Sequence, residues 1–109
     1  MHIAIFMVFG EHKVVKHIVC FKIKPEHKHR LEEAKTTLLS MMGNVPMLKK
    51  VVVGIDFLHS ERSYDLILET WFETKEDLED YQVDPYHVSV VKKLMHEIRE
   101  TSVAVDYYE

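Results

Sequence analysis

The segment Val14–Lys24, which reads VVKHIVCFKIK, decides the fold. It is rich in β-branched and aromatic residues, which is typical of a β-strand. Alternate residues of a strand point to opposite faces of its sheet, so His17 and Phe21 share one face while Ile18 and Cys20 share the other. Both faces carry apolar residues, and we therefore expect a sheet that is covered on both sides.

Short local signals divide the rest of the chain into helices and strands. Pro25 ends the first strand and is favoured at the start of a helix, and Gly43 is typical of a helix end. Thr74 and Asp84 are favoured residues at helix N-termini. The predicted elements are, in order, a strand over 14–24, a helix over 26–42, strands over 47–57 and 63–72, a short helix from Thr74, a helix from Asp84 and a strand over 102–108.

This order of elements, β-α-β-β-α-β, predicts an α+β fold of the ferredoxin-like type, with a four-stranded antiparallel sheet. The chain has 109 residues, of which 47% are hydrophobic and 29% charged, and this is usual for one globular domain. We place that domain at residues 14–109. Residues 1–13 form an N-terminal extension, which we expect to be either an extra edge strand or a loosely ordered segment.

Composition excludes several classes of partner. The formal net charge is −4 and the lysines are scattered, so we expect no binding to nucleic acid, which requires a dense basic surface. The apolar run Ile3–Phe9 is too short to cross a membrane and lacks the flanking features of a secretory signal. A single cysteine, Cys20, forms no internal disulfide. These features predict a small cytoplasmic protein with no membrane association.

The alternation of the strands predicts a homodimer. We expect the helices to cover the richer apolar face, yet the opposite face also carries apolar residues, and a second copy of the chain is the simplest cover for them. The residues expected under the helices are His17, Val19, Phe21, Val51, Val53, Leu66, Leu68, Val103 and Val105. The opposite face is expected to carry Ile18, Cys20, Val52, Ile67, Trp71, Ala104 and Tyr108, of which Ile18, Cys20, Ile67, Trp71 and Tyr108 are the predicted dimer face.

Several short segments, in this order and spacing, resemble one known family. They are Val15-Lys16-His17-Ile18-Val19 with Phe21-Lys22, Gly54, Ser63-Tyr64-Asp65-Leu66, Phe72-Glu73, and Tyr81 followed by Asp84-Pro85 and His87. Over residues 14–108 the chain resembles the stress-responsive A/B barrel domain (Dabb) family. The resemblance implies a ferredoxin-like domain that pairs sheet to sheet into a dimeric α/β barrel. Most members have no established activity, plant members are linked to stress tolerance, and one plant branch cyclises linear polyketides without a cofactor.

Three residues form the candidate catalytic site: His87, Tyr81 and His17. His87 falls near the third position of the helix that Asp84 begins, where the helix dipole favours a neutral imidazole and the Asp84 carboxylate opposes that effect. His17 points into an apolar row and needs a polar partner, which Tyr81 or His87 can supply. In the functional interpretation, His87 removes a proton next to a carbonyl, and Tyr81 hydrogen-bonds the oxygen or positions His87. In the structural interpretation, all three only stabilise the fold.

The resemblance adds further pocket residues. In the cyclase branch, the residues that match His17, Tyr81 and His87 line the site. A further pocket histidine of that branch is matched here by Leu66, and an aromatic residue of its alkyl pocket by Leu38. We therefore do not expect the plant substrate. The predicted pocket-lining residues are Leu38, Tyr64, Leu66 and Leu68.

The remaining motifs support neither a metal nor a cofactor. His27 and His29 would lie on different sides of a helix, and no other histidine or cysteine has the spacing of a zinc site. The chain has only three glycines, and these do not form the glycine-rich motif of a phosphate-binding loop. Three hypotheses remain: a dimeric Dabb protein that binds a small apolar or aromatic ligand, a cofactor-independent enzyme resembling a polyketide cyclase, lyase or monooxygenase, and a structural oligomer whose cavity is filled by its own side chains.

Overall fold

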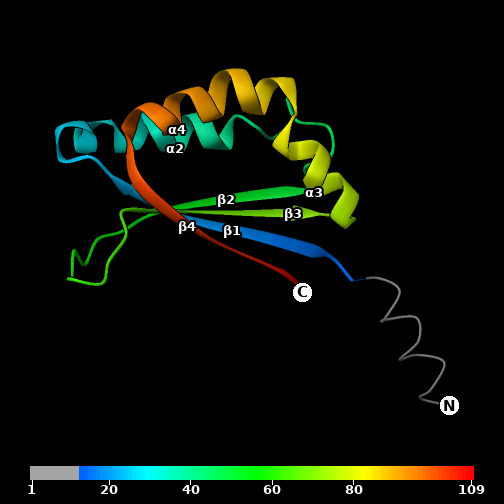
Figure 1. Cartoon of the computed structure of the whole chain (residues 1–109), viewed down its shortest axis with the longest axis horizontal. Helices are drawn as coiled ribbons and strands as arrows, with labels where there is room; N and C mark the ends of the chain where they lie inside the picture. Colours follow the sequence, from blue (N-terminus) through cyan, green and yellow to red (C-terminus); the bar gives the residue numbers. More distant parts are fainter. Residues whose placement is uncertain (1–12) are drawn as a thin grey trace, which may run out of the picture.

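The computed structural model describes residues 13–109, in which one four-stranded antiparallel sheet carries helices on one face (Figure 1). The strand order is β2-β3-β1-β4. The predicted α+β ferredoxin-like order is confirmed. Of the predicted N-terminal extension, residues 1–13, all but Lys13 lie outside the described range. The elements are β1 (Val15–Ile23), the 3₁₀ helix η1 (Pro25–Arg30), α2 (Leu31–Leu39), β2 (Lys50–Ile55), β3 (Leu66–Phe72), α3 (Lys75–Gln82), the π-helix η2 (His87–Lys92), α4 (Lys93–Ile98) and β4 (Arg99–Tyr108).

The predicted helix starts are confirmed by their side-chain caps. The hydroxyl of Thr74 accepts a hydrogen bond from the backbone N–H of Asp77 at 3.0 Å, which begins α3. The carboxylate of Asp84 accepts one from the backbone N–H of His87, also at 3.0 Å. Gly43 has a φ of +94°, a conformation that suits glycine at the end of a helical segment. Each of these contacts or conformations involves only a few neighbouring residues, and for this reason the sequence could predict where the helices begin and end.

The last helix contains a segment that its sequence did not predict. Residues His87–Lys92 form the π-helix η2, whose hydrogen bonds span five residues, before the chain continues as α4. Residues five apart in an α-helix differ by about 140° around the axis. The wider π turn brings such a pair closer to one side, so His87 and Lys92 both line the same pocket.

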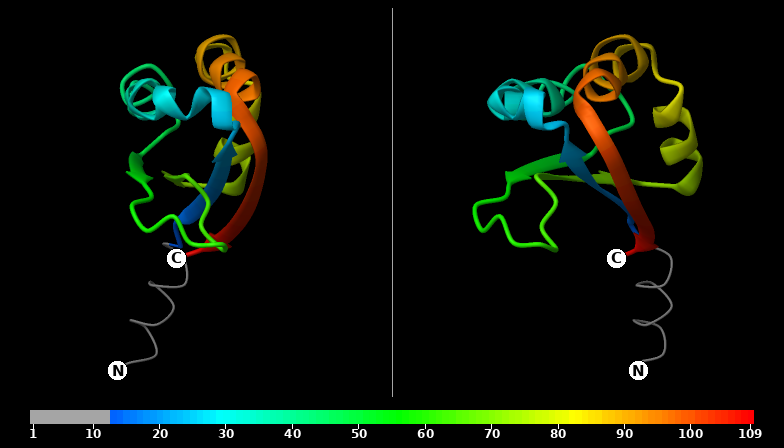
Figure 2. Two further views of the ribbon diagram at one scale, coloured as in Figure 1. Left: turned by 90° about the vertical axis from the view of Figure 1, so that its left-hand side faces the viewer. Right: turned by 60° about the vertical axis from the view of Figure 1, so that its left-hand side comes forward.

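The hydrophobic core lies between the sheet and the helices. Figure 2 shows that η1 and α2 run beside η2 and α4 across one face of the sheet, while α3 lies at one end. Leu38 of α2, Phe72 of β3 and Ile98 of α4 are fully buried in this layer. Within residues 13–109, no helix is long and apolar enough to span a membrane.

The pairing of β1 with β4 corrects the predicted face assignment of the last strand. His17 lies opposite Asp106 and Val19 opposite Ala104, so these β4 residues face the helices. Val103 and Val105 therefore lie on the other face, and their predicted placement under the helices was wrong. The alternation of residues along a strand defines its two faces but does not show which face lies under the helices. In β4, small and polar residues face the pocket beside the helices.

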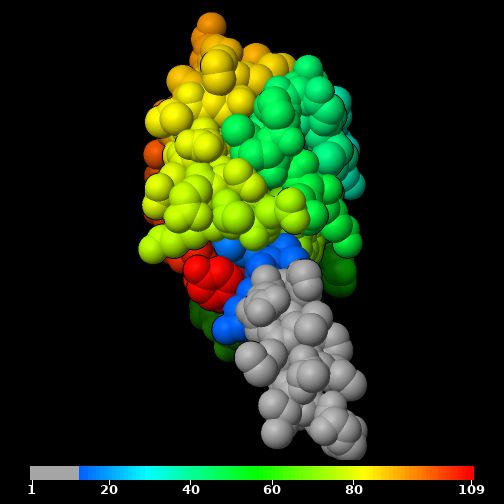
Figure 3. Space-filling view, turned by 90° about the vertical axis from the view of Figure 1, so that its right-hand side faces the viewer, coloured from blue at the N-terminus to red at the C-terminus, as the bar shows by residue number. Residues whose placement is uncertain are grey.

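Tyr108 was assigned to the wrong face for the same reason. It pairs with Val15 on the helix side, and with Val15 and Leu78 of α3 it borders a hollow at the end of the sheet. Figure 3 shows the C-terminal residues, in red, beside α3 and the start of β1. Tyr108 therefore does not belong to the predicted dimer face, whereas its neighbour Tyr107 pairs with Lys16 on that side.

The sheet face without helices, named the open face below, is strongly apolar. Val103 is 50% exposed, Val105 61% and Tyr107 42%. Trp71 is half-buried beneath the ammonium groups of Lys16 and Lys50, which lie 4.6 and 4.8 Å from the ring centre. The open face consists of the apolar or aromatic residues Ile18, Cys20, Val52, Ile67, Trp71, Val103, Val105 and Tyr107 and of the charged residues Lys16, Lys22, Lys50 and Glu69.

Candidate functional site

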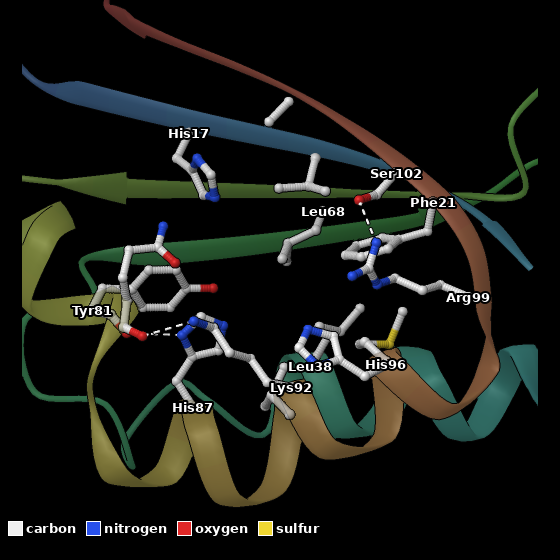
Figure 4. A pocket seen from close by; sticks show the side chains of 15 residues that line it. His17, Phe21, Leu38, Leu68, Tyr81, His87, Lys92, His96, Arg99 and Ser102 are labelled. Atoms are coloured by element: carbon white, nitrogen blue, oxygen red, sulfur yellow. Dashed lines mark hydrogen bonds between the residues drawn. The ribbon is translucent and has the colours of Figure 1, made fainter.

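A pocket of about 230 Å³ opens between the helix-covered face of the sheet and the helix that runs through η2 and α4 (Figure 4). One part of its wall is apolar, and His17, Tyr81 and His87 all lie on its lining. The apolar wall consists of Val19, Phe21, Leu38, Leu68, Val91 and Met95.

His87 is held in a defined orientation. Its Nδ1–H donates a hydrogen bond to the backbone carbonyl of Tyr81 at 2.8 Å, and its ring stacks on the Tyr81 ring at a centroid distance of 3.9 Å. A ring nitrogen that donates to a carbonyl must carry the proton, so Nε2 of the neutral ring is a proton acceptor. Among residues 13–109, no side chain or backbone group hydrogen-bonds to this Nε2.

Burial keeps the His87 ring neutral. The side chain lies in a buried position, and loss of solvation lowers the pKa of His87 below its ordinary value. The positive charge of Lys92 acts in the same direction, while the Tyr81 carbonyl and the Asp84 carboxylate oppose it. The sequence predicted that the helix dipole and the Asp84 carboxylate would shift the pKa of His87 in opposite directions. Burial is the largest effect in the structure, and it favours the neutral imidazole.

Tyr81 contributes its ring rather than its hydroxyl. The residue is 1% exposed, its ring packs against Phe72 at a centroid distance of 4.9 Å, and its hydroxyl donates to the sulfur of Met41 at 3.6 Å. Burial raises the pKa of Tyr81, so the hydroxyl stays protonated. A thioether sulfur is a weak acceptor, and the ring of Tyr81 is the part of its side chain that contacts His87.

His17 faces the pocket from the sheet. Its Nδ1 hydrogen-bonds the carboxylate of Asp106 on the neighbouring strand, and its ring meets the Tyr81 ring edge-on at 6.0 Å. Figure 4 shows the His17 ring directed from the sheet toward Tyr81. The polar partner that His17 was predicted to need is therefore Asp106, which sequence analysis missed because 89 residues separate the two.

The predicted pocket residues divide into two pairs. Leu38 and Leu68 line the pocket. Leu66 and Tyr64 do not: they border a separate hollow, and Leu66 is only 2% exposed within the core. The reason is their position, because Leu66 is the first residue of β3, at the opposite end of the strand from Tyr81, and Tyr64 precedes the strand altogether.

Three basic residues at the pocket were not predicted. Lys92, His96 and Arg99 line it from η2, α4 and the start of β4. No local signal marks Lys92, because helical periodicity would place it away from His87. Arg99 reaches the pocket because the register between β1 and β4 shifts at Lys22 and Ile23, where β4 begins.

No metal site is formed by the residues that the structure describes. Within residues 13–109, no three histidine, cysteine or acidic side chains come together as ligands. Cys20 is a free thiol on the open face, and burial raises its pKa, so it is not an activated nucleophile.

Comparison with known proteins identifies related sequences. Residues 15–109 match the model of the stress responsive A/B barrel domain family. Olivetolic acid cyclase of Cannabis sativa is 34% identical over 77 residues, which are 68% of this chain and 76% of that protein. A stress-response A/B barrel domain-containing protein of Arabidopsis thaliana is 30% identical over 102 residues, which are 87% of this chain and 36% of that protein.

The fold also matches solved structures. A dimeric protein of unknown function and ferredoxin-like fold from Bacteroides fragilis superposes with a TM-score of 0.74, covering 88% of this chain and 96% of that chain. Its sequence identity is 24%, so this likeness establishes the fold alone.

Proposed function

The chain belongs to the stress-responsive A/B barrel domain family, and we propose that it is a homodimeric member that binds a small molecule in the pocket beside His17, Tyr81 and His87. The observation that carries the proposal is the pocket itself. Its wall is largely apolar, and two anchored histidines reach it from opposite sides. Such a combination of apolar lining and a few oriented polar groups is usual for small-molecule sites.

The open face supports the homodimer. It presents apolar side chains that no element of residues 13–109 covers, with Val105 61% exposed. A second copy pairing sheet to sheet would bury them on a self-complementary two-fold surface. The related structure from Bacteroides fragilis is a dimeric protein, which agrees with this proposal. The predicted dimer-face residues Ile18, Cys20, Ile67 and Trp71 lie on the open face.

Ligand binding can be tested with two bicyclic aromatic probes of equal shape, 2-naphthoate and 2-naphthamide. We expect at least one of them to bind, to shift the NMR signals of pocket residues and to be excluded by Ala104→Trp, since Ala104 lines the pocket from β4. Val88→Trp places the same side chain on an exposed part of η2 and serves as the control. Binding by neither probe, or binding unchanged by Ala104→Trp, would contradict the proposed site.

A second candidate function is proton transfer from carbon without a cofactor. The observation that favours it is the fixed tautomer of His87, whose Nδ1 is held by the Tyr81 carbonyl while Nε2 is left as a base in a buried site. One relative of the chain, olivetolic acid cyclase, carries the name of an enzyme, which agrees with this second candidate. In this proposal Tyr81 positions His87 through the stacked ring, rather than donating its hydroxyl to the substrate.

The Kemp elimination of 5-nitrobenzisoxazole is a direct test of such a base. A base removes the proton from C3 of the probe, the N–O bond breaks, and the nitrophenolate is released and measured by its absorbance. We expect His87→Ala to abolish the protein-dependent rate while His29→Ala, in exposed η1, leaves it unchanged. A rate that is the same in both variants would contradict catalysis by His87.

We also propose that the protein acts in the cytoplasm, in a stress-related role. The free, half-buried Cys20 agrees with a reducing compartment. Nucleic acid is not among the proposed partners, because the net charge is −4.

A further inference from the structure

The pocket lining carries positively charged side chains but no negatively charged ones. Lys92 and Arg99 line it, and none of its lining residues is acidic. The Lys92 ammonium donates to the backbone carbonyl of Gln82 at 2.8 Å, and the Arg99 guanidinium donates to the hydroxyl of Ser102 at 3.2 Å. Within residues 13–109, neither cation forms an ion pair with a carboxylate, so both keep their full charge toward the pocket.

Acidic groups around the pocket are bonded to partners other than Lys92 and Arg99. Asp106 is bonded to His17 and borders the separate hollow beside α3. Asp84 caps the helix through the backbone N–H of His87. Glu97, next along the helix from His96, pairs with Arg30 on the outer surface. Asp84 and Asp106 thus act on His87 and His17, and neither carboxylate is bonded to Lys92 or Arg99.

From this arrangement, and resting on the proposed function, we infer that the ligand is a small organic anion: an apolar body that carries a carboxylate or another acidic oxygen. The body would lie against Phe21, Leu38 and Leu68, and the anionic group would lie toward Lys92 and Arg99. Figure 4 shows the Arg99 side chain reaching toward Ser102 on the side of the pocket away from His17 and Tyr81. The Lys92 ammonium lies at the other end, where it donates to the carbonyl of Gln82 next to Tyr81. The two cations therefore make both ends of the apolar wall positive.

Binding of an anion also has a consequence for the charge on His87. An anion near Lys92 would offset the positive charge that now disfavours the imidazolium. We therefore expect bound ligand to raise the pKa of His87 relative to the free protein. The signal of the His87 ring in an NMR titration reports this change without any need for catalytic turnover.

The test compares the two naphthalene probes in the full chain at about pH 7.5, where the carboxylate of 2-naphthoate is ionised. We expect 2-naphthoate to bind about tenfold more tightly than the neutral 2-naphthamide, since hydrogen bonds to ionised groups are stronger. Combining Lys92→Met with Arg99→Gln should remove this preference while the affinity for 2-naphthamide is kept. Lys93→Met, which removes a charge from an exposed position on the same helix, should leave the preference intact.

The outcomes distinguish failure of the inference about the anion from failure of the proposed binding pocket. Equal affinity for the two probes, or a preference unchanged in the double variant, would overturn the inference about the anion while leaving the binding pocket in place. Binding by neither probe would overturn the proposed function and this inference with it. If the double variant fails to fold, the single variants Lys92→Met and Arg99→Gln are compared, and each should reduce the preference for 2-naphthoate.

Discussion

The Nδ1 of His87 is bound to the backbone carbonyl of Tyr81 at 2.8 Å, and the two rings lie nearly parallel, 15° apart in plane. This contact connects the end of α3 with the start of the last helix. It fixes the tautomer of His87 through a backbone group, which substitution of the Tyr81 side chain does not remove. The orientation of the His87 imidazole, the proposed base, is thus set by a backbone carbonyl and not by a neighbouring carboxylate.

Acidification is expected to destabilise the protein through His87. Burial lowers the pKa of His87 in the folded state, whereas the unfolded chain titrates near 6.5. The unfolded chain therefore binds more protons between these two values, so the stabilisation is complete above the unfolded pKa and is lost as the pH falls through the folded one. We expect the free energy of unfolding to fall more steeply in the wild type than in His87→Gln as the pH decreases below about 6.5.

Urea denaturation at several pH values measures this difference. His29→Gln, at an exposed position of η1, is the matched control and should follow the wild type. NMR titration of the His87 ring gives its pKa directly. A His87 pKa at or above that of an unfolded chain would contradict the prediction.

The cap at Asp84 should contribute measurably to stability. Its carboxylate is buried and accepts the His87 N–H at 3.0 Å. We expect Asp84→Ala to lower the free energy of unfolding by about 1 kcal/mol, and Asp84→Asn, which keeps an acceptor, to lower it less. Thermal or urea unfolding of both variants checks the prediction, and equal losses would show that the side-chain acceptor is not what matters.

Tyr81 offers a test of which part of the side chain is used. Tyr81→Phe removes only the hydroxyl that donates to Met41 and keeps the ring stacked on His87. We expect a loss of less than about 1 kcal/mol in stability, because the sulfur is a weak acceptor. Tyr81→Ala, which leaves a cavity, should cost about 3 kcal/mol or more.

The same pair of variants bears on the proton-transfer proposal. If Tyr81 acts only by positioning His87, Tyr81→Phe retains most of the Kemp elimination rate and Tyr81→Ala loses it. A rate abolished by Tyr81→Phe would instead assign the hydroxyl a direct role.

The sequence predicted those parts of the molecule that depend on local signals. Thr74, Asp84 and Gly43 act within their own turn, and the placement of His87 beside Tyr81 follows from the short segment between them. The chain order then determined the fold class.

What the sequence did not predict depends on long-range pairing and helix geometry. The inward face of β4 depends on which residue meets His17, and its partner Asp106 lies 89 residues away. Lys92 reaches the pocket because a π turn changes the helical phase, a change that periodicity does not reveal.

The open face should lose its capacity to associate when it becomes charged. Val105→Lys places an ammonium at a position that is 61% exposed in the single chain and would be buried between two sheets. We expect this variant to be folded and monomeric. Val88→Lys introduces the same side chain at an exposed apolar residue of η2, away from the open face, and should leave the dimer intact.

Sedimentation equilibrium of the full chain at micromolar concentration is the most direct test that the sheet is covered by helices on one face and by a second copy on the other. We expect the wild type and Val88→Lys to sediment at twice the 12.9 kDa of one chain, and Val105→Lys at the mass of one chain. A wild-type protein that sediments as a single chain would contradict the proposed pairing of the open faces.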